Sequence, residues 1–442
     1  MIGSVRERVL VIGGGVSGLS ASVDLVMRGI PVYLFEARPF LGGRIYSFRD
    51  PSTGEELDNG MHLVAGFYRY FMRFLSTIGR AGSIEFGPRL EVVLADGKKR
   101  FRFRTCGLPS PLNLVCGLLR YRPFPKRDIL LLSRCLRRFR RGDDLLEGMS
   151  AGELLTSFGI SREAIRYFFR PLILSTLNAE AFEVASTIFV EMLRSILASR
   201  SSEVVLGHST IPYSSLIAGP AANFITSRGG KIYLSSRVLS IRVEGDRVVS
   251  ILDSQNREVE AFAYILAVPP HEASLLLPHL REAGEWDYSP IVSVDVWLRE
   301  GALRLIDEEM IGLTDGEFHW VFNRCSMVDG SRYITLLASG ARDMMGRDKE
   351  DLIGAASRSL KELFGIGRRD IEYARVIKER RATPLIAPGK NRARPPSRTR
   401  FKNLFLAGDW TSTGLPPTLE SAAMSGFSAA EGVMELINGG AG

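Results

Sequence analysis

The sequence predicts an α/β protein in which a discontinuous nucleotide-binding domain is combined with a second, mixed α+β domain. The first observation is an apolar run over residues 9–12 that ends in a glycine-rich turn and is followed by helical periodicity. The second is a similar strand, turn and helix near the C-terminus, over residues 403–426. The third is a group of strand-like segments at 228–268, where we expect the chain to return to the first domain.

Length and composition agree with two globular domains. The chain has 442 residues, of which 45% are hydrophobic and 24% charged. Its four cysteines lack the spacing of a zinc or redox site, so we expect reduced thiols and no metal. Since no signal-peptide pattern precedes the first strand and no apolar window is long enough to cross a bilayer, we expect a cytoplasmic protein.

The turn after the first strand fits the pattern Gly-x-Gly-x-x-Gly. Gly13 would allow the tight turn, Gly15 would let a pyrophosphate approach the helix N-terminus, and Gly18 would let the helix pack closely on the strand. A second strand over 31–35 ends at Glu36, which can accept hydrogen bonds from a ribose. This Rossmann-like unit predicts a bound dinucleotide without choosing between NAD and FAD. Neighbouring residues counted with the site are Val16, Ser17 and Ala37.

Three motifs follow over residues 36–62: Glu-Ala-Arg-Pro, Leu-Gly-Gly-Arg and Leu-Asp-Asn-Gly-Met-His. Together they resemble the amine oxidase and carotenoid desaturase superfamily of flavoproteins. The resemblance implies that the cofactor is FAD and that the loop with Gly43 and Arg44 lies against its pyrophosphate. It also implies that the segment with Gly60 and Met61 reaches the flavin.

The C-terminal strand, turn and helix support the same cofactor. The strand ends in Gly408, which permits close backbone approach, and Asp409, which would accept hydrogen bonds from ribityl hydroxyls. The amides at Thr418 and Leu419 would direct the positive end of a helix dipole toward the flavin. By the resemblance, the backbone of Val238 contacts the adenine.

The domain assignment follows from these segments. The predicted FAD-binding domain comprises 1–65, 212–270 and 398–442, and the predicted substrate domain comprises 66–211 and 271–397. We expect the first part of the substrate domain to be helix-rich. Strand-like segments at 291–298, 320–322 and 333–338 should form a sheet over the flavin. The basic, proline-rich residues 390–402 should be an exposed linker.

Positive charge is concentrated in one segment. Residues 120–141 contain nine basic residues and one acid, so this segment has a net charge of +8. The formal net charge of the whole chain is also +8. A protein-wide basic coat is therefore absent from the sequence, and we expect no nucleic-acid partner. Apolar residues recur at helical spacing opposite the arginines; they are Ile129, Leu132, Leu136 and Phe139. Residues 110–141 thus resemble a peripheral anchor on an anionic membrane, at the inner face of the cell membrane. The alternative is a helix that packs on its own protein.

Motifs along nearly the whole chain most closely resemble the hydroxysqualene dehydroxylases, also described as squalene-associated FAD-dependent desaturases. These motifs lie at 57–62, 170–172, 177–178, 290–294, 320–322, 378–383 and 407–411. The chain departs from the family at Met61, where glutamine is usual, and at Ser421 and Met424, where glycine and arginine are common. The family reaction removes the hydroxyl of hydroxysqualene to give squalene, with a hydride from reduced FAD, in squalene and hopanoid-type isoprenoid biosynthesis.

This chemistry defines what the site should contain. Because the alcohol is allylic, protonation lets water leave as an allylic cation forms, and the hydride captures that cation. His62 is the first candidate acid, and a structural histidine is the alternative. Aromatic residues that would line the pocket and favour positive charge, unless they simply pack in a core, are Phe67, Tyr68, Trp320, Phe322 and Trp410.

Two other functions stay open. A carotenoid-type desaturase would use the same fold and an apolar tunnel but would take a hydride from its substrate. A non-catalytic prenyl-lipid binding protein would need no complete FAD site, so the retention of Glu36, Arg44 and Asp409 argues against it. With one dinucleotide fingerprint in the chain, the electron donor is unknown; a soluble donor and a membrane quinone pool are both compatible.

Overall fold

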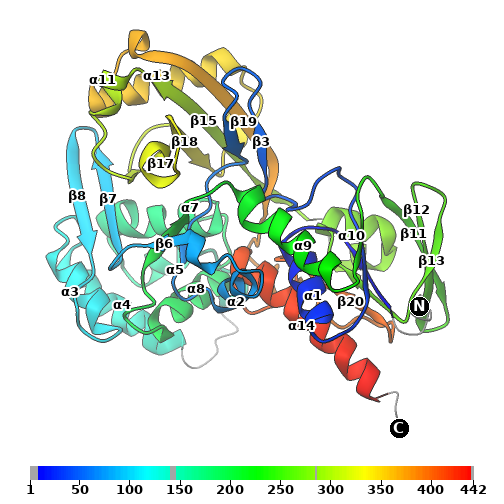
Figure 1. Ribbon diagram of the computed structural model, residues 1–442. Coiled ribbons are helices and arrows are strands. Elements are labelled where there is room, and N and C mark those ends of the chain that lie inside the picture. The colour runs from blue at the N-terminus through cyan, green and yellow to red at the C-terminus, as the bar shows by residue number, and fades with distance from the viewer. Residues whose placement is uncertain (1–7, 140–145, 284–285, 440–442) are drawn as a thin grey trace.

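The computed structural model describes residues 8–139, 146–283 and 286–439. A parallel sheet with helices α1 and α14 occupies the lower right of Figure 1, and a larger mixed sheet lies above it. Helices α3, α4, α5 and α8 form the left part of the molecule. The functional site lies where these three parts meet.

The nucleotide-binding sheet has five parallel strands in the order β10-β2-β1-β14-β20. The three central strands are almost entirely buried, which explains why they appear in the sequence as continuous apolar runs. The predicted α/β class is confirmed. The strands are β1 (Val9–Ile12), β2 (Val32–Phe35), β10 (Lys231–Tyr233), β14 (Ala263–Leu266) and β20 (Leu404–Leu406).

Two helices from opposite ends of the chain pack closely on this sheet. They are α1 (Val16–Met27) and α14 (Leu419–Gly439), which lie side by side in Figure 1. A methyl group added at Gly426 would overlap the carbonyl oxygen of Ser17. The close contact therefore depends on the missing side chain at this position.

The hairpin predicted after residue 228 is also present. An antiparallel sheet in the order β11-β12-β13 has its first turn at Gly245, where φ is +61°. Its strands are β11 (Val238–Glu244), β12 (Arg247–Asp253) and β13 (Glu258–Glu260).

The second large sheet has seven strands in the order β19-β15-β18-β17-β16-β7-β8. It contains the three strands expected from sequence, and all of its pairs are antiparallel except β16 with β7. The expectation of a helix-rich first part was incomplete, because β7 and β8 come from that part. The overlooked signal is the alternation Lys-Arg-Phe-Arg-Phe-Arg in β8, which is typical of a half-buried strand. The strands are β7 (Glu91–Asp96), β8 (Lys99–Arg104), β15 (Tyr288–Leu298), β16 (Met310–Leu313), β17 (Trp320–Asn323), β18 (Tyr333–Ser339) and β19 (Ile371–Pro384).

Helices from the first part of the substrate domain share a hydrophobic core with this sheet. Helix α5 begins with a capping box between Ser150 and Glu153, and α7 ends at Asn178, whose φ is 53°. The helices are α3 (Leu112–Arg120), α4 (Lys126–Phe139), α5 (Ala151–Ser157), α7 (Arg170–Leu177) and α8 (Ser186–Ala198). Within the described ranges, no helix is both long enough and apolar enough to span a bilayer.

The orientation of the basic helix α4 corrects the expectation from sequence. Ile129 and Leu132, which were expected to face a membrane, line an internal cavity instead. The reason is that Asp128 and Cys135 on a neighbouring stripe of the helix are buried against the protein. Leu136, Phe139 and the basic residues from Arg137 to Arg141 lie outside the described side chains.

The expected exposed linker at 390–402 contains two buried residues, Arg394 and Phe401, and Arg394 is the charged one. Arg394 is only 4% exposed, and it donates hydrogen bonds to the backbone oxygens of Asp409 (3.0 Å) and Leu415 (2.8 Å). Burial lowers the pKa of Arg394 to about 10. The basic composition suggested solvent exposure, but the carbonyl groups of the loop after β20 provide acceptors that hold this guanidinium inside the protein.

Candidate active site

One continuous cavity of about 2320 Å³ runs from the parallel sheet to helices α3 and α4. Ligand pockets rarely exceed about 1000 Å³, so this cavity has room for a dinucleotide together with a long apolar molecule. Every site residue predicted from sequence lines it except Gly18. A methyl group at Gly18 would overlap the carbonyl oxygen of Gly13, which agrees with the packing role expected for this glycine.

The first polar element of the cavity is the turn before α1. Gly13 has a φ of +107°, and a methyl group there would lie 2.5 Å from the carbonyl oxygen of Ala267. Gly15 is the N-cap of α1, and no side chain of the described residues caps this helix end. The N–H groups of the first turn are therefore available to an anion at the positive end of the helix dipole.

The carboxylate of Glu36 is buried at the end of β2. Its Oε2 accepts a hydrogen bond from the backbone N–H of Gly14 (2.7 Å), and its Oε1 accepts one from the N–H of Arg38 (2.8 Å). These two bonds fix the carboxylate at the cavity wall. Each oxygen retains acceptor capacity, as ribose hydroxyls require.

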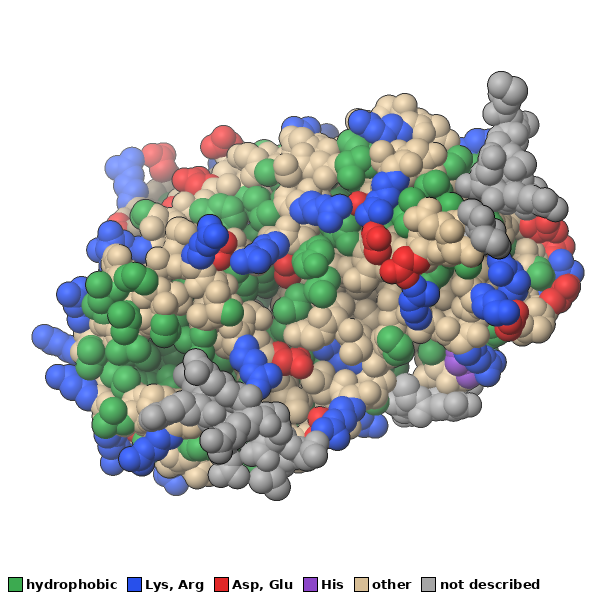
Figure 2. Space-filling view, turned by 90° about the horizontal axis from the view of Figure 1, so that it is seen from below, with side chains coloured by type: hydrophobic (Ala, Val, Ile, Leu, Met, Phe, Trp, Pro, Cys, Tyr) green, Lys and Arg blue, Asp and Glu red, His purple; other side chains and the backbone are tan. Residues whose placement is uncertain are grey.

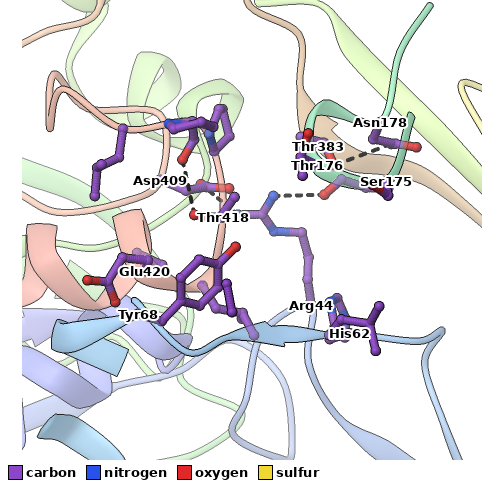
Figure 3. A pocket seen from close by; sticks show the side chains of 18 of the residues that line it. Arg44, His62, Tyr68, Ser175, Thr176, Asn178, Thr383, Asp409, Thr418 and Glu420 are labelled. Atoms are coloured by element: carbon purple, nitrogen blue, oxygen red, sulfur yellow. Dashed lines mark hydrogen bonds and ion pairs between the residues drawn. The ribbon is translucent and has the colours of Figure 1, made fainter. Parts of the chain in front are cut away.

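Arg44 connects three segments that are distant in sequence. Its Nη2 lies 2.7 Å from Oδ1 of Asp409, and its Nη1 donates to the carbonyl oxygen of Ala382 at 2.8 Å. Figure 3 shows this side chain extending between Asp409 on one side and Thr383 on the other. Arg44 therefore links the loop after β2 to the end of β20 and to β19.

The N-terminus of α14 forms the opposite wall. Thr418 precedes the helix and lies beside the hydroxyl of Tyr68, and burial raises the pKa of Tyr68 to about 12. The carboxylate of Glu420 accepts hydrogen bonds from the N–H groups of Tyr70 (3.0 Å) and Phe71 (2.9 Å) in the first turn of α2 (Arg69–Thr77). Glu420 was not predicted from the sequence, where its only signal is an acidic residue within the apolar stripe of the last helix.

His62 follows β4 (Glu56–Asp58), and its backbone N–H donates to the hydroxyl of Tyr213 (2.7 Å). Burial, together with the positive charges of Arg44 and Arg324, lowers the pKa of His62 to about 4. Its Nε2 atom has no hydrogen-bond partner among the described residues. The ring is therefore neutral at pH 7 and is available for a hydrogen bond.

A buried ion pair holds the segment that carries His62. Nη2 of Arg324 lies 2.5 Å from Oδ2 of Asp58, and Nη1 of Arg324 lies 2.7 Å from Sδ of Met61. The other carboxylate oxygen of Asp58 accepts hydrogen bonds from the Ser47 hydroxyl (2.7 Å) and the Tyr213 N–H (3.0 Å). Arg324 was not predicted from the sequence, because it lies 266 positions from its partner.

The predicted aromatic residues lie in the cavity wall in two ways. Trp320 and Phe322 on β17 have nearly parallel rings, with centroids 6.2 Å apart and an interplanar angle of 21°. Trp410 is almost fully buried, and its Nε1 donates to the carbonyl oxygen of Val268 at 3.0 Å, so it mainly anchors the wall. Phe67 and Tyr68 meet edge to face.

Beyond these rings the cavity is lined mostly by apolar side chains from β7, β8 and the helices on the left of Figure 1. They include Val92, Leu94, Phe103, Leu114, Leu118, Ile129, Leu132, Phe168, Leu193 and Ile196. The site therefore has a polar end that fits FAD and a long apolar chamber.

Comparisons with known proteins agree with this geometry. The family model described as flavin containing amine oxidoreductase matches residues 16–434. Hydroxysqualene dehydroxylase from Sinorhizobium fredii is 28% identical over 98% of this chain and 99% of its own length. The 15-cis-phytoene desaturase of Glycine max is 23% identical, over 97% of this chain and 79% of its own length. An oxidoreductase from Methanosarcina mazei has the same fold, with a TM-score of 0.74 and 20% identity over 96% of this chain and all of its own.

These matches confirm three predictions: the α/β fold, FAD as the cofactor and the resemblance to hydroxysqualene dehydroxylases. The turn at Gly13–Gly18, the carboxylates of Glu36 and Asp409, and the first turn of α14 are the groups that would hold FAD. The chain belongs to the family of flavin containing amine oxidoreductases and is an FAD-dependent oxidoreductase.

Proposed function

We propose that this enzyme reductively removes the hydroxyl group of hydroxysqualene to give squalene. The observation that carries the proposal is the continuity of the cavity, in which the FAD end and the apolar chamber are one space of about 2320 Å³. A long isoprenoid chain gains from burial against such walls. The name of the relatives from Sinorhizobium fredii and Zymomonas mobilis supports the same substrate.

In the proposed reaction a C–O bond breaks and a C–H bond forms at the same carbon. Reduced FAD, when bound, supplies the hydride and is oxidised by two electrons. A proton joins the leaving hydroxyl, so that water is the second product. The apolar walls keep other water away from the allylic cation, and the faces of Trp320 and Phe322 favour its charge. His62, with a neutral ring, is assigned a hydrogen bond to the leaving group.

A carotenoid-type desaturase is the main alternative, and it is supported by the similarity to phytoene desaturase. The two reactions need opposite oxidation states of the flavin. A non-catalytic prenyl-lipid binding protein is disfavoured, because Glu36, Arg44 and Asp409 together line the cavity.

The test uses purified holoenzyme whose flavin is reduced anaerobically and then mixed with hydroxysqualene. We expect squalene to form in proportion to the flavin that is reoxidised. If the flavin stays reduced and the alcohol is recovered unchanged, the proposed reaction is wrong. The oxidised enzyme with a polyene precursor is the parallel arm, and newly conjugated product there would establish the desaturase instead.

We also propose that the enzyme binds an anionic membrane through an outer face of α3 and α4, at the inner side of the cell membrane. Four leucines are 47–68% exposed on or beside these helices: Leu108, Leu112, Leu119 and Leu130. Figure 2 shows hydrophobic side chains gathered at this end of the molecule with Lys and Arg side chains around them. The exposed basic residues there include Arg120, Arg122, Lys126, Arg127 and Arg134. Their charge complements anionic lipid, and the inner faces of the same helices line the cavity.

Vesicle sedimentation tests this surface. The wild type should bind vesicles that contain phosphatidylglycerol and should bind neutral phosphatidylcholine vesicles weakly. The double variant Leu112→Ser, Leu119→Ser should bind at least about tenfold less, since each leucine contributes about 1.5–3 kcal/mol when buried. The matched control is Leu239→Ser, Leu275→Ser, two leucines that are 52% and 59% exposed and lie outside α3 and α4. Equal losses in both variants, or no binding by the wild type, would exclude the surface.

A further inference from the structure

One wall of the apolar chamber carries a small polar group that none of the roles above uses. It is formed by the last turn of α7 and the end of β19, with Ser175, Thr176, Asn178 and Thr383. Figure 3 shows these four residues gathered on the side of the cavity away from Tyr68, Thr418 and Glu420. The residue before Thr383 is Ala382, which accepts a hydrogen bond from Arg44, so the group lies beside the FAD end of the cavity.

The side-chain amide of Asn178 has a defined orientation. Its Oδ1 accepts a hydrogen bond from the N–H of Gly340 (3.1 Å), and its Nδ2 donates to the carbonyl oxygen of Ser289 (2.9 Å). Because one partner is an N–H and the other a carbonyl, exchanging the two amide ends would place donor against donor and acceptor against acceptor. The second N–H of the same Nδ2 is therefore the group that meets Oγ1 of Thr383, 3.3 Å away.

This contact determines what Thr383 can offer. Its hydroxyl accepts the hydrogen bond from Asn178, so its own proton is directed elsewhere. In the part of the chain that the structure describes, no protein group accepts that proton. Ser175 and Thr176 differ, because both donate to the carbonyl oxygen of Leu172, at 3.0 and 2.6 Å, and present only lone pairs. Thr383 is thus the hydrogen-bond donor of this polar group.

We propose that Thr383, oriented by Asn178, binds the hydroxyl oxygen of an isoprenoid alcohol and makes the cavity select the alcohol over the matching hydrocarbon. The inference rests on the proposed function, because it assumes a long isoprenoid ligand in this chamber. A single neutral donor suits a neutral alcohol. A hydrocarbon would leave the donor unpaired in an apolar cavity, and that penalty corresponds to selection of about five- to hundredfold.

The test compares the binding of hydroxysqualene and squalene to the holoenzyme. Binding is detected by quenching of tryptophan fluorescence, because Trp320 lines the cavity. The wild type should bind the alcohol at least about fivefold more tightly than the hydrocarbon. Thr383→Val, which keeps the shape and removes the donor, should bring the ratio of the two Kd values close to one by weakening alcohol binding. Thr383→Ser, which keeps the hydroxyl, should retain the wild-type ratio. Flavin content and Tm check folding, and Thr383→Ala replaces the valine variant if that one does not fold.

The outcomes separate this inference from the proposed function. A Kd ratio near one in the wild type, or a ratio unchanged in Thr383→Val and Thr383→Ala, overturns the role of Thr383. Turnover by reduced wild-type enzyme is scored separately. If the enzyme selects the alcohol through Thr383 but forms no squalene, the inference about Thr383 stands and the proposed reaction is wrong. If the enzyme forms squalene and Thr383→Val leaves its selectivity unchanged, the proposed reaction stands and the inference about Thr383 is wrong.

Discussion

The buried ion pair of Arg324 and Asp58 gives a quantitative prediction for stability. The two side chains are 3% and 4% exposed, and the pair supports the segment with Met61 and His62. Arg324→Met keeps most of the apolar volume but leaves the carboxylate without its counter-charge. Breaking a buried pair costs about 3–5 kcal/mol, and we expect the lower end, about 3 kcal/mol, because Asp58 keeps two hydrogen bonds. In a chain of 442 residues this loss corresponds to a decrease of about 3 °C in Tm.

Urea unfolding followed by tryptophan fluorescence measures the effect. The control is Arg358→Met, because Arg358 is 66% exposed and pairs with Glu317, 39% exposed, at 3.2 Å. Loss of such a surface pair should cost less than about 1 kcal/mol. The double variant Asp58→Asn, Arg324→Met should recover part of the stability, since no uncompensated charge stays buried. If Arg324→Met loses no more stability than Arg358→Met, the reasoning is refuted.

Three further predictions concern single residues. His62 has a folded pKa of about 4, below its usual 6.5, so the unfolded chain binds more protons between these values. Stability should fall as pH decreases through this window, by up to about 1.4 kcal/mol per pH unit, and His62→Gln should reduce that slope in urea titrations. Arg394→Met should weaken FAD binding about tenfold, measured by fluorescence titration, because the loop after β20 loses its internal donor; unchanged affinity would contradict this. Gly426→Ala should cost about 1–3 kcal/mol by forcing α1 and α14 apart, whereas Gly439→Ala, where no atom of the described residues lies within 4 Å of the added methyl group, should be neutral in the same melts.

Features that depend on local pattern were predictable from the sequence. The glycine turn, the strand that ends at Glu36 and the hairpin around Gly245 each follow from residues within a short window. Even the separate role of Gly18 followed, because helix packing and ligand approach make different demands on a backbone. The residues predicted to surround the cofactor and the substrate also line one cavity, except Gly18, but part of that set was assigned through the resemblance to flavoproteins and not from local pattern.

Features that depend on a distant partner were not predictable. Arg324 is an ordinary basic residue until the fold places it beside Asp58. Arg394 belongs to a segment whose composition indicates exposure, yet distant carbonyl groups bury it. On α4, helical periodicity identified the stripe of Ile129 and Leu132 but could not show that a cavity lies opposite it.

Because Arg44 joins segments that are far apart in the sequence, the fold also constrains the order in which the chain is synthesised, folds and assembles its cofactor site. Arg44 and Asp409 are 365 positions apart, and β14 pairs with β20 only after nearly all of the chain has been synthesised. Until then, the growing polypeptide exposes an unpaired edge of a buried parallel sheet, which is the state most open to aggregation. The groups that would hold the cofactor are therefore brought together only after β20 has been synthesised. Flavin supply during expression should therefore act on chains that already contain β20 and raise the yield of folded protein.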